Sequence, residues 1–185
     1  KGSYNHMLAN LLPGLAPAGM TIKAGPSIDM PLYNADMQAQ GFPPAATALA
    51  EAIRAADGVI IVSPEYNWTI PGGLKNAIDW VSRVKDQPFA NKAVALQSCS
   101  MGILGGARMQ YHMRQSMVFL DAYVFNKLEV LVAVAQNKFD DKTGELKDDA
   151  TRDVVRQQLA AFAKFIAMIG GKAAMVQFEV AYDYK

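Results

Sequence analysis

Short apolar runs alternate along this chain with segments in which apolar residues recur at helical spacing. Residues 58–62, Gly-Val-Ile-Ile-Val, form an almost continuous β-branched run, as expected for a strand covered on both faces. Leu74, Ile78 and Val81 follow at helical spacing, and residues 92–98 resume a strand. This alternation predicts the α/β class, a parallel sheet with helices packed on its faces.

The same pattern places elements along most of the remaining chain. Helices are expected over residues 5–16, 47–56 and 106–120, and strands over residues 20–23 and 123–135. Neither an internal repeat nor a low-complexity linker divides them. We therefore expect a single domain over residues 1–185.

The C-terminal part of the sequence predicts one long helix and a strand-like tail. Apolar residues recur there at spacings of four and three and form a core-facing stripe: Val155, Leu159, Phe162, Ile166 and Ile169. Asp148 or Asp149 is available to cap the first turn, and Gly170 with Gly171 ends the helix. Residues 175–182 have the composition of one more strand.

Composition narrows the classes of partner. The chain carries 18 basic and 17 acidic residues, a formal charge of +1 without a basic block, which argues against nucleic acid. No apolar run approaches the roughly 20 residues that cross a bilayer. One cysteine and two histidines exclude an intrachain disulfide and the usual zinc clusters, and they fit a reducing cytoplasm. Two roles are open for Cys99, a redox thiol and simple packing, and packing is favoured.

Three segments that join strands to helices, or begin a helix, carry the candidate chemistry. Residues 63–71 follow a buried strand with aromatic and hydrogen-bonding groups, at the edge where ligands of open α/β sheets bind. Residues 98–106 are rich in small residues, but their Gly-x-x-Gly-Gly spacing matches neither the dinucleotide fingerprint nor the Walker loop. Ser3 and Asn5 begin a helix and form either an anion site or an ordinary cap.

Taken together, these segments resemble the NADPH-dependent FMN reductase family, in particular its branch of quinone and chromate reductases. The specific part is Pro64-Glu65-Tyr66-Asn67 with its continuation Leu-Lys-Asn-Ala-Ile-Asp-Trp at residues 74–80. The similarity also runs through residues 1–5, 31–34, 98–108 and 136–140.

The resemblance implies a fold, a cofactor and a site. The fold is a flavodoxin-like three-layer sandwich with a five-stranded parallel sheet, strand order 2-1-3-4-5, and FMN at the switch point. Ser3 and Asn5 correspond to phosphate contacts. The isoalloxazine ring would lie against Pro64, Glu65, Tyr66 and Asn67, and its pyrimidine edge against Ser98, Ser100 and Gly102. The cofactor performs the chemistry, so no catalytic side chain is expected.

The implied activity is that of an FMN-dependent oxidoreductase. It takes hydride from NAD(P)H and passes two electrons to quinones, chromate or similar small acceptors. The family forms homodimers or homotetramers, and Arg108, Tyr111 and Glu129 match interface positions near the flavin. A flavodoxin-type electron carrier is an alternative, but a charge of +1 provides no acidic docking surface. A rearranged scaffold that holds flavin weakly is a further alternative.

The chain departs from the family pattern at its beginning and in its tail. The family starts with a strand and a Gly-Ser-x-Arg segment just before the position of Lys1. That strand is central, so its loss would leave both neighbours with unpaired backbone. Residues 170–185 lie outside the pattern, and the segment 175–182 is a candidate to fill the central position. The alternatives are a strand from a partner chain and an incomplete sequence.

Overall fold

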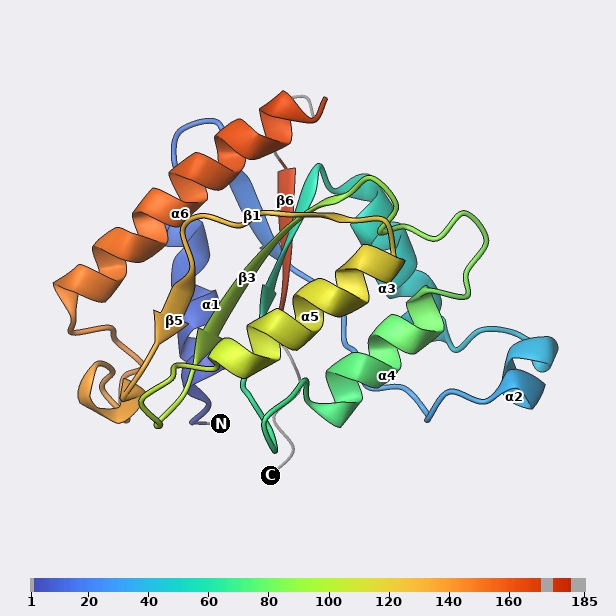
Figure 1. Cartoon of the computed structure of the whole chain (residues 1–185), viewed down its shortest axis with the longest axis horizontal. Coiled ribbons are helices and arrows are strands. Elements are labelled where there is room, and N and C mark those ends of the chain that lie inside the picture. Colours follow the sequence, from blue (N-terminus) through green and yellow to red (C-terminus); the bar gives the residue numbers. More distant parts are fainter. Residues whose placement is uncertain (1, 171–174, 181–185) are drawn as a thin grey trace.

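The computed structural model describes residues 2–170 and the strand at 175–180. Its six-stranded sheet has the order β1-β6-β2-β3-β4, with β5 also paired to β3, and every strand pair is parallel (Figure 1). The strands are β1 (Thr21–Ala24), β2 (Gly58–Val62), β3 (Ala93–Cys99), β4 (Tyr123–Val124), β5 (Val130–Val132) and β6 (Met175–Val180). The helices are α1 (Tyr4–Leu15), α2 (Ala35–Gln40), α3 (Pro44–Ala55), α4 (Gly72–Val81), α5 (Ala107–Phe119) and α6 (Asp149–Met168), with a short 3-10 turn η1 (Ala135–Asn137).

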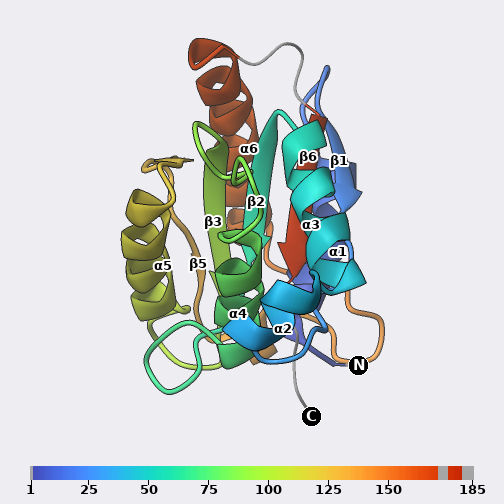
Figure 2. The same cartoon turned by 90° about the vertical axis from the view of Figure 1, so that its right-hand side faces the viewer.

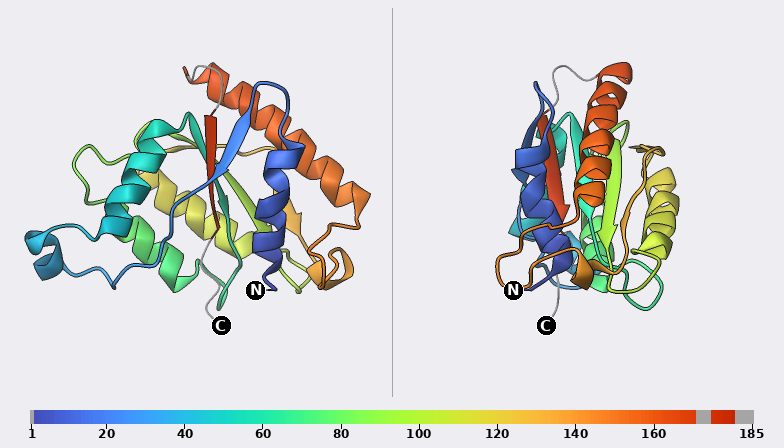
Figure 3. Two further views of the ribbon diagram at one scale, coloured as in Figure 1. Left: turned by 180° about the vertical axis from the view of Figure 1, so that it is seen from behind. Right: turned by 90° about the vertical axis from the view of Figure 1, so that its left-hand side faces the viewer.

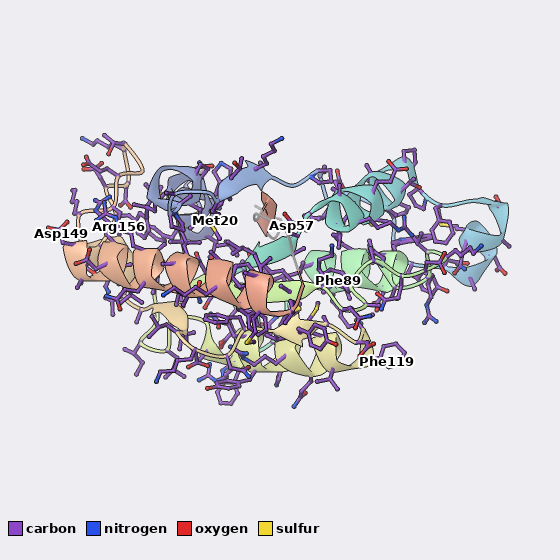
Figure 4. All side chains as sticks on the ribbon, turned by 90° about the horizontal axis from the view of Figure 1, so that it is seen from above. Met20, Asp57, Phe89, Phe119, Asp149 and Arg156 are labelled. Carbon is purple, nitrogen blue, oxygen red and sulfur yellow. The ribbon has the colours of Figure 1, made fainter. Side chains whose placement is uncertain are left out.

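Helices cover both faces of the sheet, as the alternating pattern predicted. Ile60 and Val62 of β2 pack into one apolar core with α1 and α6, whereas Val59 and Ile61 pack into a second core with α3, α4 and α5. Successive side chains of a strand point to opposite faces, so a fully apolar strand supplies both cores. The three layers are visible from the side and from behind (Figures 2 and 3), and the view from above places α1 and α6 opposite α3 and α4 (Figure 4).

Strand β6 lies between β1 and β2 and pairs with both. Val176 stands opposite Ile22 on one side and Gly58 on the other. It is the last strand in the sequence, yet it occupies an interior position of the sheet. Residues 171–174 and 181–185 of the tail lie outside the described residues. The strand predicted over residues 175–182 is therefore described only as far as residue 180.

The expected count of five strands is wrong, because the strand predicted over residues 123–135 is broken. Its first part, β4, pairs with Ala93 and Val94, and its second part, β5, pairs with residues 97–99 of β3. The Gln158 side chain bridges the interruption by donating hydrogen bonds to Leu96 O (3.2 Å) and Leu128 O (2.7 Å). A side chain from α6 thus satisfies carbonyl groups that a continuous strand would have paired.

The helices mostly match their predicted positions. The exception is α2, which was not expected and is capped by Asn34, whose side chain accepts hydrogen bonds from the N–H groups of Asp36 and Met37. Met109, Met113 and Met117 recur every four residues on α5 and are fully buried in the core, whereas Met101 is exposed. Within the described ranges, no helix is long and apolar enough to cross a membrane.

Asp148 caps the longest helix and provides a test of local stability. Its carboxylate accepts hydrogen bonds from the N–H (2.9 Å) and the hydroxyl of Thr151, and Lys138 Nζ lies 3.2 Å away. These contacts, the Thr151 hydroxyl first, hold the pKa of the Asp148 carboxyl below its usual range. Asp148→Ala should lower the free energy of unfolding at neutral pH by about 1 kcal/mol, the usual value of an N-cap.

A lowered pKa in the folded state means that this stabilisation is present above the pKa of the unfolded chain and is lost as the pH falls through the folded value. The difference between wild type and Asp148→Ala in urea unfolding should therefore shrink below about pH 4. Asp153→Ala is the matched control, because Asp153 lies on the same helix in an exposed ion pair with Arg156. Equal losses in both variants, or a difference unchanged in acid, would contradict the prediction.

Candidate functional site

The carboxyl ends of β2 and β3 meet the start of α1 at one edge of the sheet (Figure 1). The Asn5 side chain makes this contact: its Nδ2 donates to Cys99 O (3.0 Å), and its Oδ1 accepts from Cys99 N (2.8 Å). The Asn5 carboxamide therefore pairs with the end of β3 as another strand would. This contact joins the start of α1, with Ser3 and Asn5, to the loop at residues 98–106, two of the three segments that were expected to form a site.

The start of α1 presents donors for an anion. Ser3 is the N-cap, and its Oγ accepts a hydrogen bond from His6 N (3.3 Å). The first N–H groups of a helix have no acceptor within it, so those of Tyr4 and Asn5 point out of the first turn. Because the Asn5 side chain is buried against Cys99, Asn5 can offer an anion only its backbone N–H group. Backbone donors at a helix start are suited to a phosphate.

A tight hairpin follows β2. Tyr66 and Thr69 exchange backbone hydrogen bonds of 3.1 and 3.0 Å, and the two residues between them have positive φ, 48° at Asn67 and 68° at Trp68. This is the pattern of a two-residue turn in which both central residues are left-handed. Asn67 and Trp68 are exposed at the tip, whereas Pro64 is buried at the base. Left-handed backbone is common for asparagine and uncommon for tryptophan.

Glu65 connects this hairpin to α5. Its carboxylate accepts hydrogen bonds from the N–H groups of Arg108 (3.0 Å) and Met109 (3.4 Å) and pairs with Arg108 Nη1 at 2.5 Å. The helix has Gly106 at its N-cap, which supplies no side-chain acceptor. Glu65 thus caps α5 from a distant part of the chain. The Glu65 carboxylate is therefore engaged within the protein, and the Glu65 backbone lies at the base of the hairpin.

The loop between β3 and α5 is held by buried polar groups. Ser98 is fully buried, and its Oγ donates to Gly105 O (2.6 Å) and accepts from Gln110 Nε2 (2.9 Å). Ser100 is half-buried, and its Oγ accepts from the N–H of the exposed Gly102 (3.0 Å). The Ser98 hydroxyl therefore shapes the loop from beneath, while Ser100 and Gly102 lie on its accessible side.

The two adjacent glycines of this loop are required by close approach. A Cβ on Gly105 would lie 2.7 Å from the carbonyl carbon of Leu131, and one on Gly106 would lie 2.7 Å from the Ser98 side chain. Both residues also have positive φ, 58° and 87°. Only glycine accommodates both conditions, which brings the loop against β3 and β5.

Three contacts at this edge were not foreseen from the sequence: the Asn5 pairing with Cys99, the Glu65 cap and the role of Gln110. Gln110 is fully buried, and its Nε2 also donates to Val130 O (2.9 Å). The signal available in the sequence was the position of Gln110 beside Met109 on a helix that packs on the sheet. A buried side-chain amide needs hydrogen-bond partners, so a glutamine at such a position indicates a polar contact in the core. Cys99 belongs to the α1/α6 core, and burial raises the pKa of its thiol far above the usual range, which favours packing over redox chemistry.

The donor set at this edge fits FMN. The N–H groups of Asn67 and Trp68 have no acceptor among residues 2–170 and 175–180, and both residues are exposed. These groups can reach the polar edge of a flat ring, while the start of α1 provides donors for its phosphate. In the same described ranges, no cluster of His, Cys, Asp and Glu is arranged for a metal ion.

Fold and candidate site together define an open parallel α/β protein, the class in which ligands bind at the carboxyl ends of the central strands. The family model described as NADPH-dependent FMN reductase matches residues 1–137. The chain therefore belongs to the NADPH-dependent FMN reductase family.

Relatives cover almost the whole chain. It is 58% identical over 171 residues to a quinone reductase of Escherichia coli, covering 91% of each protein. It is 46% identical to an NAD(P)H-dependent FMN reductase of Pseudomonas aeruginosa, covering 92% of this chain and 91% of that protein. Among solved structures, the flavoenzyme NAD(P)H:(acceptor) oxidoreductase FerB of Paracoccus denitrificans matches with a TM-score of 0.79 and 29% identity, over 91% of this chain and 92% of that one.

Proposed function

We propose that this protein is an FMN-dependent NAD(P)H oxidoreductase that passes two electrons through flavin to quinones, chromate or similar small acceptors. The main structural support for this function is that three segments meet at one edge of the sheet. Asn5 contacts Cys99, and Glu65 caps α5. Relatives named quinone reductase and FMN reductase support the same activity. When bound, FMN supplies the two-electron chemistry, so no side chain has to act as nucleophile or base.

The residues of the chain then bind and orient the cofactor. Ser3 and the N–H groups at the start of α1 would hold the phosphate. Pro64, Glu65, Tyr66 and Asn67 would support the ring, and Ser100 and Gly102 would flank its pyrimidine edge. We assign Ser98 a supporting part in the same loop, because its hydroxyl is used for Gly105 and Gln110.

We also propose that β6 takes the place of the first strand of the family. Its parallel pairing with β1 and β2 supports this assignment. The observed order β1-β6-β2-β3-β4 then corresponds to the order 2-1-3-4-5 of a flavodoxin-like sheet, with the last strand divided into β4 and β5. In this arrangement the single domain covers residues 1–185.

A homodimer or homotetramer is part of the proposal, with Arg108, Tyr111 and Glu129 at the subunit interface. Support comes from α5, where Tyr111 is 53% exposed and Phe119 is 84% exposed, an unusual surface for a helix of an isolated protein. Phe119 projects outward from the end of α5 (Figure 4). A hydrogen bond to the Glu129 carboxylate raises the pKa of the Tyr111 phenol. A cytoplasmic location is consistent with the single buried cysteine.

Reconstitution with FMN tests the proposed activity. The loaded protein should be yellow, its flavin absorbance should bleach on anaerobic addition of NADPH or NADH, and a quinone should restore it. Protein that stays colourless overturns the proposal in favour of a scaffold with weak flavin binding. Bound flavin that neither nicotinamide reduces, but that exchanges electrons with a reduced protein partner, would instead establish the electron-carrier alternative.

A further inference from the structure

The hairpin Tyr66–Thr69 contains a conformation that its own sequence does not favour. Trp68 has a φ of 68° and is 69% exposed, so neither backbone preference nor burial of the indole stabilises its position. A bulky residue in left-handed backbone persists where surrounding contacts maintain it, and such sites are frequent around ligands. The neighbouring contacts of Trp68 therefore identify what maintains this turn.

One face of α5 provides those contacts. The guanidinium carbon of Arg108 lies 3.9 Å from the centre of the Trp68 ring, within the range of a cation–π contact. The same guanidinium pairs with Glu65 at 2.5 Å. One helical turn further, His112 Nδ1 lies 2.7 Å from Thr69 Oγ1. Arg108 and His112 are four residues apart and thus share a face of the helix, so α5 holds the base, the tip and the far end of the hairpin.

We propose that Arg108 is a positioning residue for the flavin site. By lying between the Glu65 carboxylate and the Trp68 ring, it maintains the left-handed turn at Asn67 and Trp68, and with it the direction of their N–H groups. Arg108 acts through the hairpin and does not itself touch the flavin. That the ligand is FMN rests on the proposed function, whereas the contact between Arg108 and Trp68 is present in the protein without any ligand.

A double-mutant cycle tests this role through FMN affinity. Arg108→Met and Trp68→Leu should each weaken FMN binding about fivefold, the size of one exposed cation–π contact. The double variant should be no weaker than Arg108→Met, because both substitutions remove the same contact. At saturating FMN, Arg108→Met should raise KM for a quinone more than it lowers kcat, which a loss of stability alone would not produce. Arg108→Lys, which keeps the charge, should recover part of the affinity.

Arg83→Met is the matched control, because the Arg83 guanidinium lies 5.4 Å from the Tyr33 ring, a second cation–π contact outside the three segments of the site. It should leave FMN affinity and KM within about twofold of wild type. In FMN-free protein, Arg108→Met should change the near-ultraviolet circular dichroism of the indoles as Trp68→Leu does, and Arg83→Met should not.

The outcomes separate the inference from the proposed function. Wild-type protein that binds no FMN overturns both. Wild-type protein that binds FMN and reduces quinones, together with Arg108→Met at unchanged FMN affinity and KM, overturns the positioning role alone. Strictly additive losses in the double variant also overturn it, since Arg108 would then not act through Trp68.

Discussion

A chain that ends at residue 170 should fail to form a cooperatively folded domain. This truncation removes β6, which pairs with β1 through residues 175–178 and with β2 through residues 176–180. Both neighbours would be left with unpaired backbone in the middle of the sheet, and the two apolar cores would open at that line. Domains are stable by only about 5–15 kcal/mol, less than the loss of an interior strand. Circular dichroism and urea unfolding would show the loss of a cooperative transition.

Proline substitutions make the same test without shortening the chain. Gln177 stands opposite Lys23 and Val59 at the middle of β6, and Gln177→Pro would remove a ladder donor and disrupt the strand. Ala18→Pro is the control: Ala18 is the first central residue of a turn closed by Met20 N to Pro17 O (3.0 Å), with Gly19 at φ 83°. Proline is favoured there. A truncated chain or Gln177→Pro variant as stable as wild type would disprove the role of β6.

Replacing Asn67 should separate flavin retention from folding. Asn67→Ala removes the side-chain amide at the exposed tip and places alanine at a φ of 48°, so FMN affinity should fall about tenfold or more. Asn67→Gly tolerates the backbone and removes only the amide. If both variants lose FMN affinity, the Asn67 side chain contacts FMN. If only Asn67→Ala loses affinity, the left-handed conformation of the turn is what FMN binding requires. Fluorescence of released FMN and thermal unfolding provide the two measurements.

Asn91 offers a matched control for this experiment. It is also an exposed asparagine with positive φ, 59°, but it precedes β3 at the opposite end of the sheet. Asn91→Ala should lower thermal stability at least as much as Asn67→Ala, because Asn91 Oδ1 also accepts a hydrogen bond from the Tyr123 hydroxyl (3.0 Å), while FMN affinity should stay unchanged. If neither asparagine variant alters FMN binding, the ring has been assigned to the wrong loop.

Much of the fold was predictable because it depends on local periodicity. The apolar run of β2 and the spacing of Leu74, Ile78 and Val81 reflect burial that each element requires wherever it packs. Residues 64–67 and 74–80 indicated the family for a similar reason, since they are contiguous in sequence. The break between β4 and β5 was not predictable, because the carbonyl groups beside it are bonded to Gln158, a side chain from a helix distant in sequence.

The candidate site was predictable as a set of segments but not as a set of contacts. Asn5 and Cys99 are separated by 94 positions, and Glu65 and Arg108 by 43, so no local pattern records their hydrogen bonds. Asn5 was expected near the phosphate and Ser98 near the pyrimidine edge of a flavin, and in the structure both side chains make hydrogen bonds within the protein. A polar side chain can bind a ligand or make hydrogen bonds within the protein, and only its neighbours in the folded structure show which of these roles it has.

The sequence by itself determined the alternation of strands and helices, the two apolar faces of the sheet and the segments that carry the family resemblance, because these follow from the spacing of neighbouring residues. Only the tertiary structure decided that the last strand lies inside the sheet between β1 and β2, and that α5 holds the hairpin through Arg108 and His112. Such long-range pairings depend on which surfaces meet after the layers have packed, and local spacing contains no information about that choice.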